Sequence, residues 1–497
     1  MVFSSVIFLN IFFPIVLVIY YTVSRLTDRD ATRNRRAKNI TLLLASIAFY
    51  GAGGYKYLLL LGAVLLINYF GGLATDSLPA GRNRSAMIVA VILDLGLLFC
   101  FKYLNLFVLT YENLQLIITG DAAAGWQNLL TLTRTGALSY VDIALPIGIS
   151  FYIFQSISYV ADVYRKEAIV QRNFFDFALY VSFFPQLIAG PIVKYSDIAS
   201  QIRDRQETLS SVESGITRFI YGLSKKVLIA NTVAVIADDI WALEIKGLGA
   251  SITWLGAICY TLQIYFDFSG YSDMAIGLGR IFGFNFKENF NYPYISGSVQ
   301  EFWRRWHLSL STWFKEYVYI PLGGSRCSMA KTIRNIFLVF LLTGIWHGAN
   351  FTFLVWGLIY ALFLIAERLF LRKLLQKKHA RIPAHLYTLF VVIIGWVFFR
   401  SDHILQAFEF IREMFRTGNG EYSVFSFLSM KGIIAITAGI LLSFPIYPAV
   451  CARIKNLPTR TQIFWRSAGL VWQFLLLIIS ITVIVSGSYN PFIYFQF

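Results

Sequence analysis

Long apolar stretches separated by short polar loops run along the whole chain. A helix needs about 20 apolar residues to cross the hydrocarbon core of a bilayer, and most of the stretches approach that length. The pattern predicts an all-α bundle of about 12 membrane-spanning helices. The stretches are 4–24, 39–53, 55–75, 86–109, 141–162, 213–236, 249–270, 333–350, 351–371, 385–400, 432–451 and 467–488.

The apolar segment 174–193 does not fit a simple crossing. Basic residues both precede and follow it, among them Arg172 and Lys194. Since Lys and Arg gather in cytoplasmic loops, a full crossing would place these two residues on opposite sides. We expect a re-entrant or in-plane hairpin broken at Pro185 and at 190–191, because irregular backbone at membrane depth survives only inside protein or beside a cavity.

Basic residues also predict the orientation of the chain. Six of them lie between Arg25 and Lys38, which places this loop in the cytoplasm and the N-terminus outside. Counting onward, the segment 110–140 and the C-terminus lie outside, and 271–332 faces the cytoplasm. Arg412 and Arg416 fit this scheme least well.

Composition supports a membrane protein and excludes other classes. Hydrophobic residues make up 57% of the chain and charged residues 14%, too little polar surface for a soluble protein. The net charge of +16 could indicate nucleic-acid binding, but the basic residues lie in short loops, which favours contact with anionic lipid. The four cysteines lack metal-ligand spacing, so we expect no metal site. No linker divides the chain, which predicts a single domain over 1–497.

His347 lies deep in the stretch 333–350. It follows Arg334 by thirteen residues, or about 20 Å along a helix. An ionisable group at membrane depth is costly and is a functional candidate by default. Imidazole titrates near neutrality, so His347 could act as a general base on a hydroxyl group. Gly348 would allow substrate or another backbone to approach closely.

The segment 301–316, EFWRRWHLSLSTWFKE, predicts an amphipathic helix in the cytoplasmic interface. Alone, His307 on its apolar face would be a core histidine with a satisfied hydrogen bond, but the nearby His347 makes it a second candidate. The apolar face carries Trp303, Trp306, His307, Leu310, Trp313 and Phe314, and the polar face carries Arg304, Arg305, Thr312, Lys315 and Glu316.

A third polar cluster lies in 265–284, YFDFSGYSDMAIGLGRIFGF, at the inner end of a predicted span. Asp267, Ser269 and Asp273 could cap a helix and bond a loop. They could instead form a polar mouth that positions a donor.

These motifs together resemble the membrane-bound O-acyltransferase family, in its branch of alginate-type polysaccharide O-acetyltransferases. The resemblance covers nearly the whole chain, with core motifs in 142–357, and the D-alanine transferase of teichoic acid shares them. The motifs are LPIGISFYIFQSISYVADVYR (145–165), FFPQLIAGPIVKYSDI (183–198), 265–284, NFNYPYISGSVQEFWRRWHLSLSTWFKEYVYIPLGG (289–324) and LTGIWHGANFTFLVWG (342–357).

The resemblance implies a bundle around a central funnel. The histidine of the WHG motif, His347, would be the catalytic residue, and His307 would be the second important position. A cytoplasmic and an extracellular funnel would meet at His347. The remaining residues expected to bind the donor are Trp346, Asn350, Asp267, Ser269, Asp273, Trp303, Arg304 and Arg305.

The chain ends in an aromatic tail, NPFIYFQF (490–497). Such a tail could anchor the last span in the interface. The resemblance implies that Tyr494 takes the acyl group covalently. A phenol has a pKa near 10, so it would need the deep histidine as its base.

The sequence therefore predicts a transmembrane O-acetyltransferase in the inner membrane of a bacterium. An acetyl group would pass from acetyl-CoA or an acyl carrier protein, through Tyr494, to an extracytoplasmic SGNH/esterase-like partner that modifies a polysaccharide. We expect no permanently bound cofactor. The alternatives are D-alanyl-type transfer from a carrier protein, and a lipid or polymer transporter without acyl chemistry. Alginate, acetylated cellulose, peptidoglycan and other exopolysaccharides all remain open as the polymer.

Overall fold

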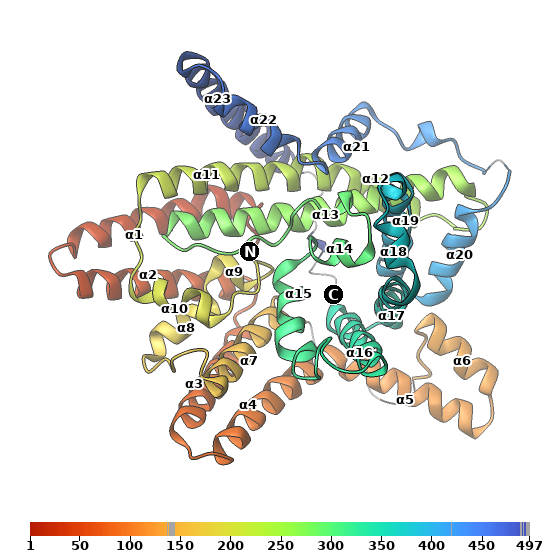
Figure 1. Cartoon of the computed structure of the whole chain (residues 1–497), viewed down its shortest axis with the longest axis horizontal. Helices are drawn as coiled ribbons and strands as arrows, with labels where there is room; N and C mark the ends of the chain where they lie inside the picture. Colours follow the sequence, from red (N-terminus) through yellow and green to blue (C-terminus); the bar gives the residue numbers. More distant parts are fainter. Residues whose placement is uncertain (137, 139–144, 419, 488–489, 491, 494–497) are drawn as a thin grey trace.

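The computed structural model describes residues 1–136, 138, 145–418, 420–487, 490 and 492–493. This part of the chain consists of helices and loops without a strand, which confirms the all-α class (Figure 1). Eight helical segments within it are long and apolar enough to cross a membrane, and a ninth is possible if the bent pair Met430–Leu442 and Ile446–Lys455 forms one span. The number of about 12 spans stays a prediction.

The first helices of the chain form three pairs, α1 with α2, α3 with α4 and α5 with α6, which follow the edge of the molecule from the left to the lower right of Figure 1. The polar start of α2 is capped by Asp30, whose carboxylate accepts the amide hydrogens of Thr32 and Arg33 at 2.9 and 3.1 Å, as expected for an N-cap residue. The helices are α1 Phe13–Leu26, α2 Ala31–Gly51, α3 Tyr57–Ser77, α4 Arg82–Leu98, α5 Leu104–Thr119 and α6 Ala122–Thr131.

The apolar segment 174–193 is broken, as the sequence predicts. It forms α8 Phe174–Ser182 and α9 Phe184–Leu187, followed by irregular backbone. All residues in 177–193 are buried, so the irregular part lies inside the protein. The neighbouring helices are α7 Ile149–Arg165, α10 Tyr195–Arg203, α11 Leu209–Ser224, α12 Asn231–Trp241 and α13 Gly249–Ile281.

The long helices α11 and α13 run side by side through the middle of the bundle (Figure 1). Two glycines allow this close contact: a Cβ atom on Gly222 would lie 2.6 Å from the carbonyl oxygen of Gly270. Small residues at helix crossings are typical of membrane bundles. The cluster 265–284 lies mostly within α13, so Asp267 and Asp273 are in the middle of a continuous helix and do not cap its end.

The single helix expected over 301–316 is wrong. The structure has α14 Val299–Trp303 and α15 Leu308–Phe314, with His307 between them in a left-handed conformation at φ 43°. The 289–291 segment takes the backbone hydrogen bonds that a continuous helix would make. The Leu308 amide donates to the Asn289 carbonyl, and the Asn291 amide to the Arg305 carbonyl, both at 2.9 Å. The predicted apolar face is nevertheless buried.

The last third of the chain packs α16 and α17 beside the α14–α15 segment, whereas α22 and α23 project from the body (Figure 1). The helices are α16 Met329–His347, α17 Phe351–Ala366, α18 Arg372–Leu375, α19 Arg381–Arg400, α20 Ile404–Met414, α21 Met430–Leu442, α22 Ile446–Lys455 and α23 Thr459–Val485. Short 3₁₀ and π turns extend or join the helices at Phe8–Phe12, Phe99–Tyr103, Lys225–Ala230, Pro293–Ile295, Lys315–Tyr319, Glu367–Leu371, Lys378–Ala380 and Val424–Ser426.

Candidate active site

His347 is the last residue of α16, and its side chain lies in an aromatic enclosure. The imidazole is 4% exposed and its centroid lies 5.0, 4.8 and 5.1 Å from the rings of Trp346, Trp356 and Phe399. All three rings meet the imidazole nearly edge-on, which is a favoured arrangement for aromatic pairs. The enclosure fixes the ring at the junction of α16 and α17.

The turn after His347 is held from both sides. Asn350 caps α17 by accepting the Thr352 amide hydrogen at 2.9 Å, and its own amide donates to the Asp402 carbonyl at 2.7 Å. The Phe353 ring packs against Gly348, where a Cβ atom would lie 2.2 Å from the ring. The close approach expected at Gly348 is therefore made by Phe353.

Lys102 is the residue of this site that the sequence reasoning missed. It belongs to the π turn Phe99–Tyr103, and its ammonium group donates to the carbonyls of Trp346 and His347 at 2.6 and 3.2 Å and to the Ser150 hydroxyl at 3.3 Å. The Tyr103 hydroxyl donates to the Ile345 carbonyl at 2.8 Å. The last carbonyl groups of a helix have no donor within the helix, and Lys102 and Tyr103 supply donors to those of α16. Lys102 is the lone basic residue in the apolar stretch 86–109. Because a charge within the membrane is costly, its presence there could have identified Lys102 as a functional candidate.

His307 is far from Trp346 in the sequence, but its imidazole contacts the same Trp346 ring that His347 contacts. Its imidazole centroid is 6.1 Å from that of Trp346 and 4.6 Å from that of Phe268. The side chain is completely buried, and burial lowers the pKa of His307 to about 3. The imidazole is therefore neutral at physiological pH. The structure thus brings both predicted histidines to one tryptophan.

A small cavity of about 40 Å³ lies against His347. Besides His347, its polar lining includes Lys102 and Ser150, and Trp346, Ile188 and the other residues of 145–151 complete it. Such a space is large enough for a water molecule or the tip of a small group.

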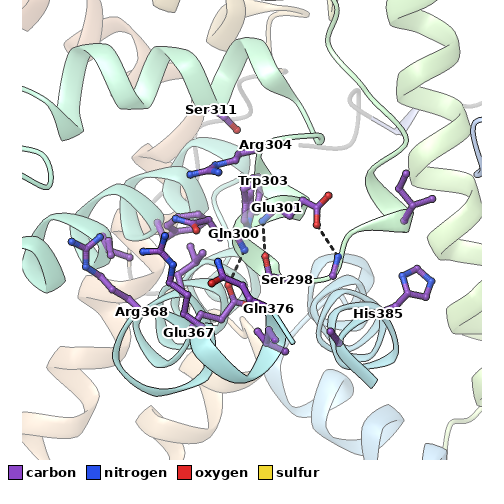
Figure 2. A pocket seen from close by; sticks show the side chains of 18 of the residues that line it. Ser298, Gln300, Glu301, Trp303, Arg304, Ser311, Glu367, Arg368, Gln376 and His385 are labelled. Atoms are coloured by element: carbon purple, nitrogen blue, oxygen red, sulfur yellow. Dashed lines mark hydrogen bonds between the residues drawn. The ribbon is translucent and has the colours of Figure 1, made fainter. Parts of the chain in front are cut away.

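A second cavity, of about 1190 Å³, lies among α14, α15, α16, α17 and α19 (Figure 2). Its apolar wall follows one face of α16 through Ile336, Val339 and Phe340 to Thr343, one helical turn before His347. Its basic lining residues are Arg304, Lys315, Arg368, Arg372, Lys377 and Arg381. The cavity thus combines a positively charged part with an apolar wall that leads toward the histidine.

Glu367 holds one wall of this large cavity in place. Its carboxylate accepts the amide hydrogens of Val299 and Gln300, the first two of α14, at 2.6 and 3.0 Å. Figure 2 shows the bond to Gln300. An acidic group at a helix N-terminus satisfies donors that have no partner within the helix. The contact fixes α14 to the π turn Glu367–Leu371 that follows α17, and with it Trp303 and Arg304 at the cavity.

The expected donor-binding residues divide into two groups. Trp303 and Arg304 line the large cavity, and Trp346 lines the small one. The others are not among the lining residues of either: Arg305 pairs with Glu301 at 2.9 Å, and Asn350 holds the turn described above. Within α13, Asp267 pairs with Lys226 and Asp273 with Arg218 and Lys225, each at 2.7 Å, and Ser269 is buried.

Tyr494 lies outside the described residues, but the residues just before it are placed. Phe492 and Ile493 are 4% and 2% exposed. The Ile493 amide donates to the Asp267 carboxylate at 2.8 Å, and the Phe492 ring stacks on Tyr271 at 4.4 Å. This part of the tail is therefore packed against α13 inside the protein. Asp267 is adjacent in sequence to Phe268, the ring that contacts His307.

No group of three or more His, Cys, Asp or Glu side chains in the described parts of the chain is arranged to hold a metal ion. The polar groups at the site are suited to proton transfer and to binding an anionic, partly apolar ligand.

Comparison with known proteins agrees with this arrangement. The family described as MBOAT, membrane-bound O-acyltransferase family, matches residues 87–402, which include Lys102 and both histidines. A protein of Pseudomonas putida named "Probable alginate O-acetylase AlgI" is 40% identical, and the alignment covers 100% of each chain.

Two further relatives match most of the chain, and the name of one of them contains a different polymer. The protein of the same name from Pseudomonas aeruginosa is 44% identical over 87% of this chain and 78% of its own. A "Peptidoglycan O-acetyltransferase" of Helicobacter pylori is 34% identical over 83% of this chain and 80% of its own.

Proposed function

Because the chain belongs to the membrane-bound O-acyltransferase family, we propose that it carries an acetyl group from a cytoplasmic thioester across the bacterial inner membrane for O-acetylation of a polysaccharide. The family assignment makes the chain a multi-pass membrane acyltransferase, which sets aside a transporter without acyl chemistry. Donor, route and acceptor are the parts proposed.

The observation that carries the proposal is the position of His347 at the end of α16, where it lines the small cavity and follows the last α16 residue of the large cavity, Thr343, by one helical turn. The large cavity runs along α16 to Thr343, and the small one touches His347 itself. Arg304 and Lys315 of the large cavity lie in the 271–332 segment, which is expected to face the cytoplasm, and the small cavity includes residues 145–151, which follow the segment expected outside. A donor from one side and an acceptor from the other would meet at the imidazole.

Acetyl-CoA is the donor that suits the large cavity best. Coenzyme A carries a diphosphate and a further phosphate on a thin pantetheine arm, whereas the arm of a carrier protein carries one phosphate. Six basic side chains line the cavity, and cationic side chains bind phosphate oxygens through charge-assisted hydrogen bonds. The apolar face of α16 would then guide the arm and its acetyl group toward His347.

In the proposed reaction, His347 removes the proton from an acceptor hydroxyl as the oxygen attacks the thioester carbonyl. An ester bond forms, the carbon–sulfur bond breaks, and the imidazolium returns the proton to the departing thiolate. We propose Tyr494 as the first acceptor, because Phe492 and Ile493 hold the tail against α13 beside the His307 contact. An extracytoplasmic SGNH/esterase-like partner would then pass the acetyl group to the polysaccharide.

We infer an alginate-type exopolysaccharide as the first polymer to examine. The two relatives with 40% and 44% identity carry the alginate O-acetylase name. Peptidoglycan is the second candidate, because the relative with that name covers 83% of this chain.

The proposal is tested by release of free coenzyme A from acetyl-CoA by the purified protein. We expect release by the wild type and a loss of about 10²–10⁴-fold in His347→Ala, the range that a positioned acid–base group supplies. His379→Ala, a change at an exposed histidine, is the matched control and should retain wild-type rates. Equal rates in the two variants, or no release by the wild type with any acyl thioester, would contradict the proposal.

A further inference from the structure

Asn289 contacts His307 in a way that specifies which ring nitrogen of the histidine carries the proton. The Nδ1 atom of His307 lies 3.2 Å from the Oδ1 atom of Asn289. Neutral imidazole has one nitrogen that donates and one that accepts. Which is which depends on the identity of the Asn289 atom that faces the ring.

The Ser309 backbone amide identifies that atom. It lies 3.1 Å from the same Asn289 atom, and a backbone N–H can only donate. The Asn289 atom must therefore be the carbonyl oxygen, because the flipped amide would direct its NH₂ group at the N–H of Ser309. The orientation of Asn289 follows from a donor whose role is fixed.

The Ser309 hydroxyl does not change this assignment. It donates to the Asn289 oxygen at 2.9 Å and lies farther, at 3.4 Å, from the His307 Nδ1 atom. Its single proton is used in the shorter bond. An unprotonated Nδ1 would set its lone pair against the lone pairs of the Asn289 oxygen, so Nδ1 must carry the hydrogen.

The second nitrogen, Nε2, is then the one with a lone pair. It is buried and has no hydrogen-bond partner among the described residues. The surrounding groups are the aromatic rings of Phe268, Phe290, Phe151 and Trp346. A buried acceptor without a partner costs free energy, and such groups are retained where a ligand or a reacting group uses them.

The backbone around His307 is constrained by the same asparagine. His307 is a non-glycine residue in the left-handed region, a conformation that costs about 1–2 kcal/mol. The Asn289 carbonyl accepts the amide hydrogen of Leu308, the next residue. Asn289 therefore binds the His307 segment through both its main chain and its side chain. A left-handed conformation such as that of His307 persists only where the surrounding structure holds it.

We propose that Asn289 is a positioning residue that holds His307 in the Nδ1–H tautomer, so that Nε2 is the nitrogen presented to the reacting groups. The tautomer follows from the hydrogen bonds alone, and its importance for the reaction rests on the proposed function. With Nε2 unprotonated, His307 acts as an acceptor: it can take a hydrogen bond from the acceptor hydroxyl or from the departing thiol.

The tautomer is measurable by ¹⁵N magnetic resonance of the full-length protein with labelled histidine side chains. The chain has five histidines, and His307→Gln identifies the signals of His307 by their loss. We expect the wild type to show a protonated Nδ1 and an unprotonated Nε2. Asn289→Asp should keep this pattern, because a carboxylate also accepts from Nδ1. Asn289→Ala should lose it, because the bond to one nitrogen determines which one is protonated.

Ser309→Ala is the matched control, because it removes the hydroxyl but retains the Ser309 amide that orients Asn289. It should keep the Nδ1–H form. A protonated Nε2 in the wild type, or an unchanged pattern in Asn289→Ala, would overturn the inference.

Turnover separates this inference from the proposed function. Asn289→Ala should lower kcat for coenzyme A release about tenfold or more, with KM for acetyl-CoA unchanged. The loss is a part of the rate enhancement of about 10²–10⁴-fold that a positioned acid–base group supplies. Rescue in Asn289→Asp would support a role through the tautomer, and an equal loss in both would contradict it. Full activity of His307→Gln would remove His307 from the reaction, whereas the tautomer in the wild type would still be determined by the resonance experiment.

Discussion

Lys102 shows how one side chain can stabilise the end of α16, the helix that carries the proposed catalytic residue His347. An ammonium group inside a membrane bundle needs partners, and Lys102 has two carbonyls of α16 and the Ser150 hydroxyl. The terminal carbonyls of α16, in turn, have no partner within the helix. The ammonium group and the helix carbonyls therefore satisfy each other's hydrogen-bonding capacity, and the contact fixes His347 at the end of α16.

Lys102→Met keeps the length of the side chain and removes the donor. Two helix carbonyls then lose a partner, which costs about 1–3 kcal/mol per buried group, and His347 becomes less precisely placed. We expect kcat for coenzyme A release to fall about tenfold or more, because small displacements of a catalytic group reduce rates strongly. KM for acetyl-CoA should not change, since the large cavity is lined by other residues.

Lys102→Arg is the comparison for this measurement, because it retains a cation with several donors. Its kcat should lie between those of the wild type and Lys102→Met. A change in KM alone, or full activity in Lys102→Met, would show that the contact does not position His347.

The sequence identified residues by the cost of burying them but not by what they contact. A histidine in an apolar stretch identified His347 as a candidate, and the same argument applied to the stretch 86–109 would have found Lys102. Asn289 could not be found this way. Its role depends on a bond to Ser309 across twenty residues, and an asparagine in a polar loop gives no such signal.

At the scale of elements, the hydrophobic periodicity of 301–316 correctly predicted which side chains are buried, but wrongly predicted one continuous helix. Trp303, Trp306, Leu310 and Trp313 are all buried, as the helical spacing over 301–316 requires. The chain reaches this burial with two short helices because the 289–291 segment takes two of the backbone hydrogen bonds. Hydrophobic spacing contains no information about hydrogen bonds to another segment, so the break at His307 was not predictable.

The C-terminal tail is the element on which the transfer route depends. Tyr494→Phe keeps the ring and removes the hydroxyl, so it removes the proposed nucleophile and leaves the packing of Phe492 and Ile493 intact. We expect loss of polysaccharide acetylation in cells, with normal amounts of the protein in the membrane. The measurement is acetyl content of the isolated polymer.

Tyr422→Phe serves as the control, because Tyr422 is an exposed tyrosine and the same atom is removed. It should acetylate the polymer normally. Normal acetylation in Tyr494→Phe as well would exclude the phenol as a carrier, and the final acceptor would have to meet His347 directly.

At the scale of the whole molecule, hydropathy predicted a helical membrane bundle, and loop charges predicted its orientation. Neither could predict the cavities, because these arise where distant segments meet: the large one among α14, α15, α16, α17 and α19, and the small one between Lys102, the 145–151 segment and the end of α16. The residues that line the large cavity come from segments up to about 150 positions apart, from Ile295 to Phe444. The resemblance to a family supplied the expectation of two funnels, and the structure shows a cavity along α16 and another at its end.

The central claim is that an acetyl group crosses the membrane by way of His347. Inverted membrane vesicles test it most directly, because their outer surface is the cytoplasmic face and acetyl-CoA does not cross the bilayer. Acetyl-CoA with a radiolabelled acetyl group is added outside, and label on polymer inside the vesicles is counted. The account predicts label in vesicles with the wild-type protein and a decrease of about 10²-fold or more with His347→Ala at equal protein content. Equal labelling with His347→Ala would contradict it.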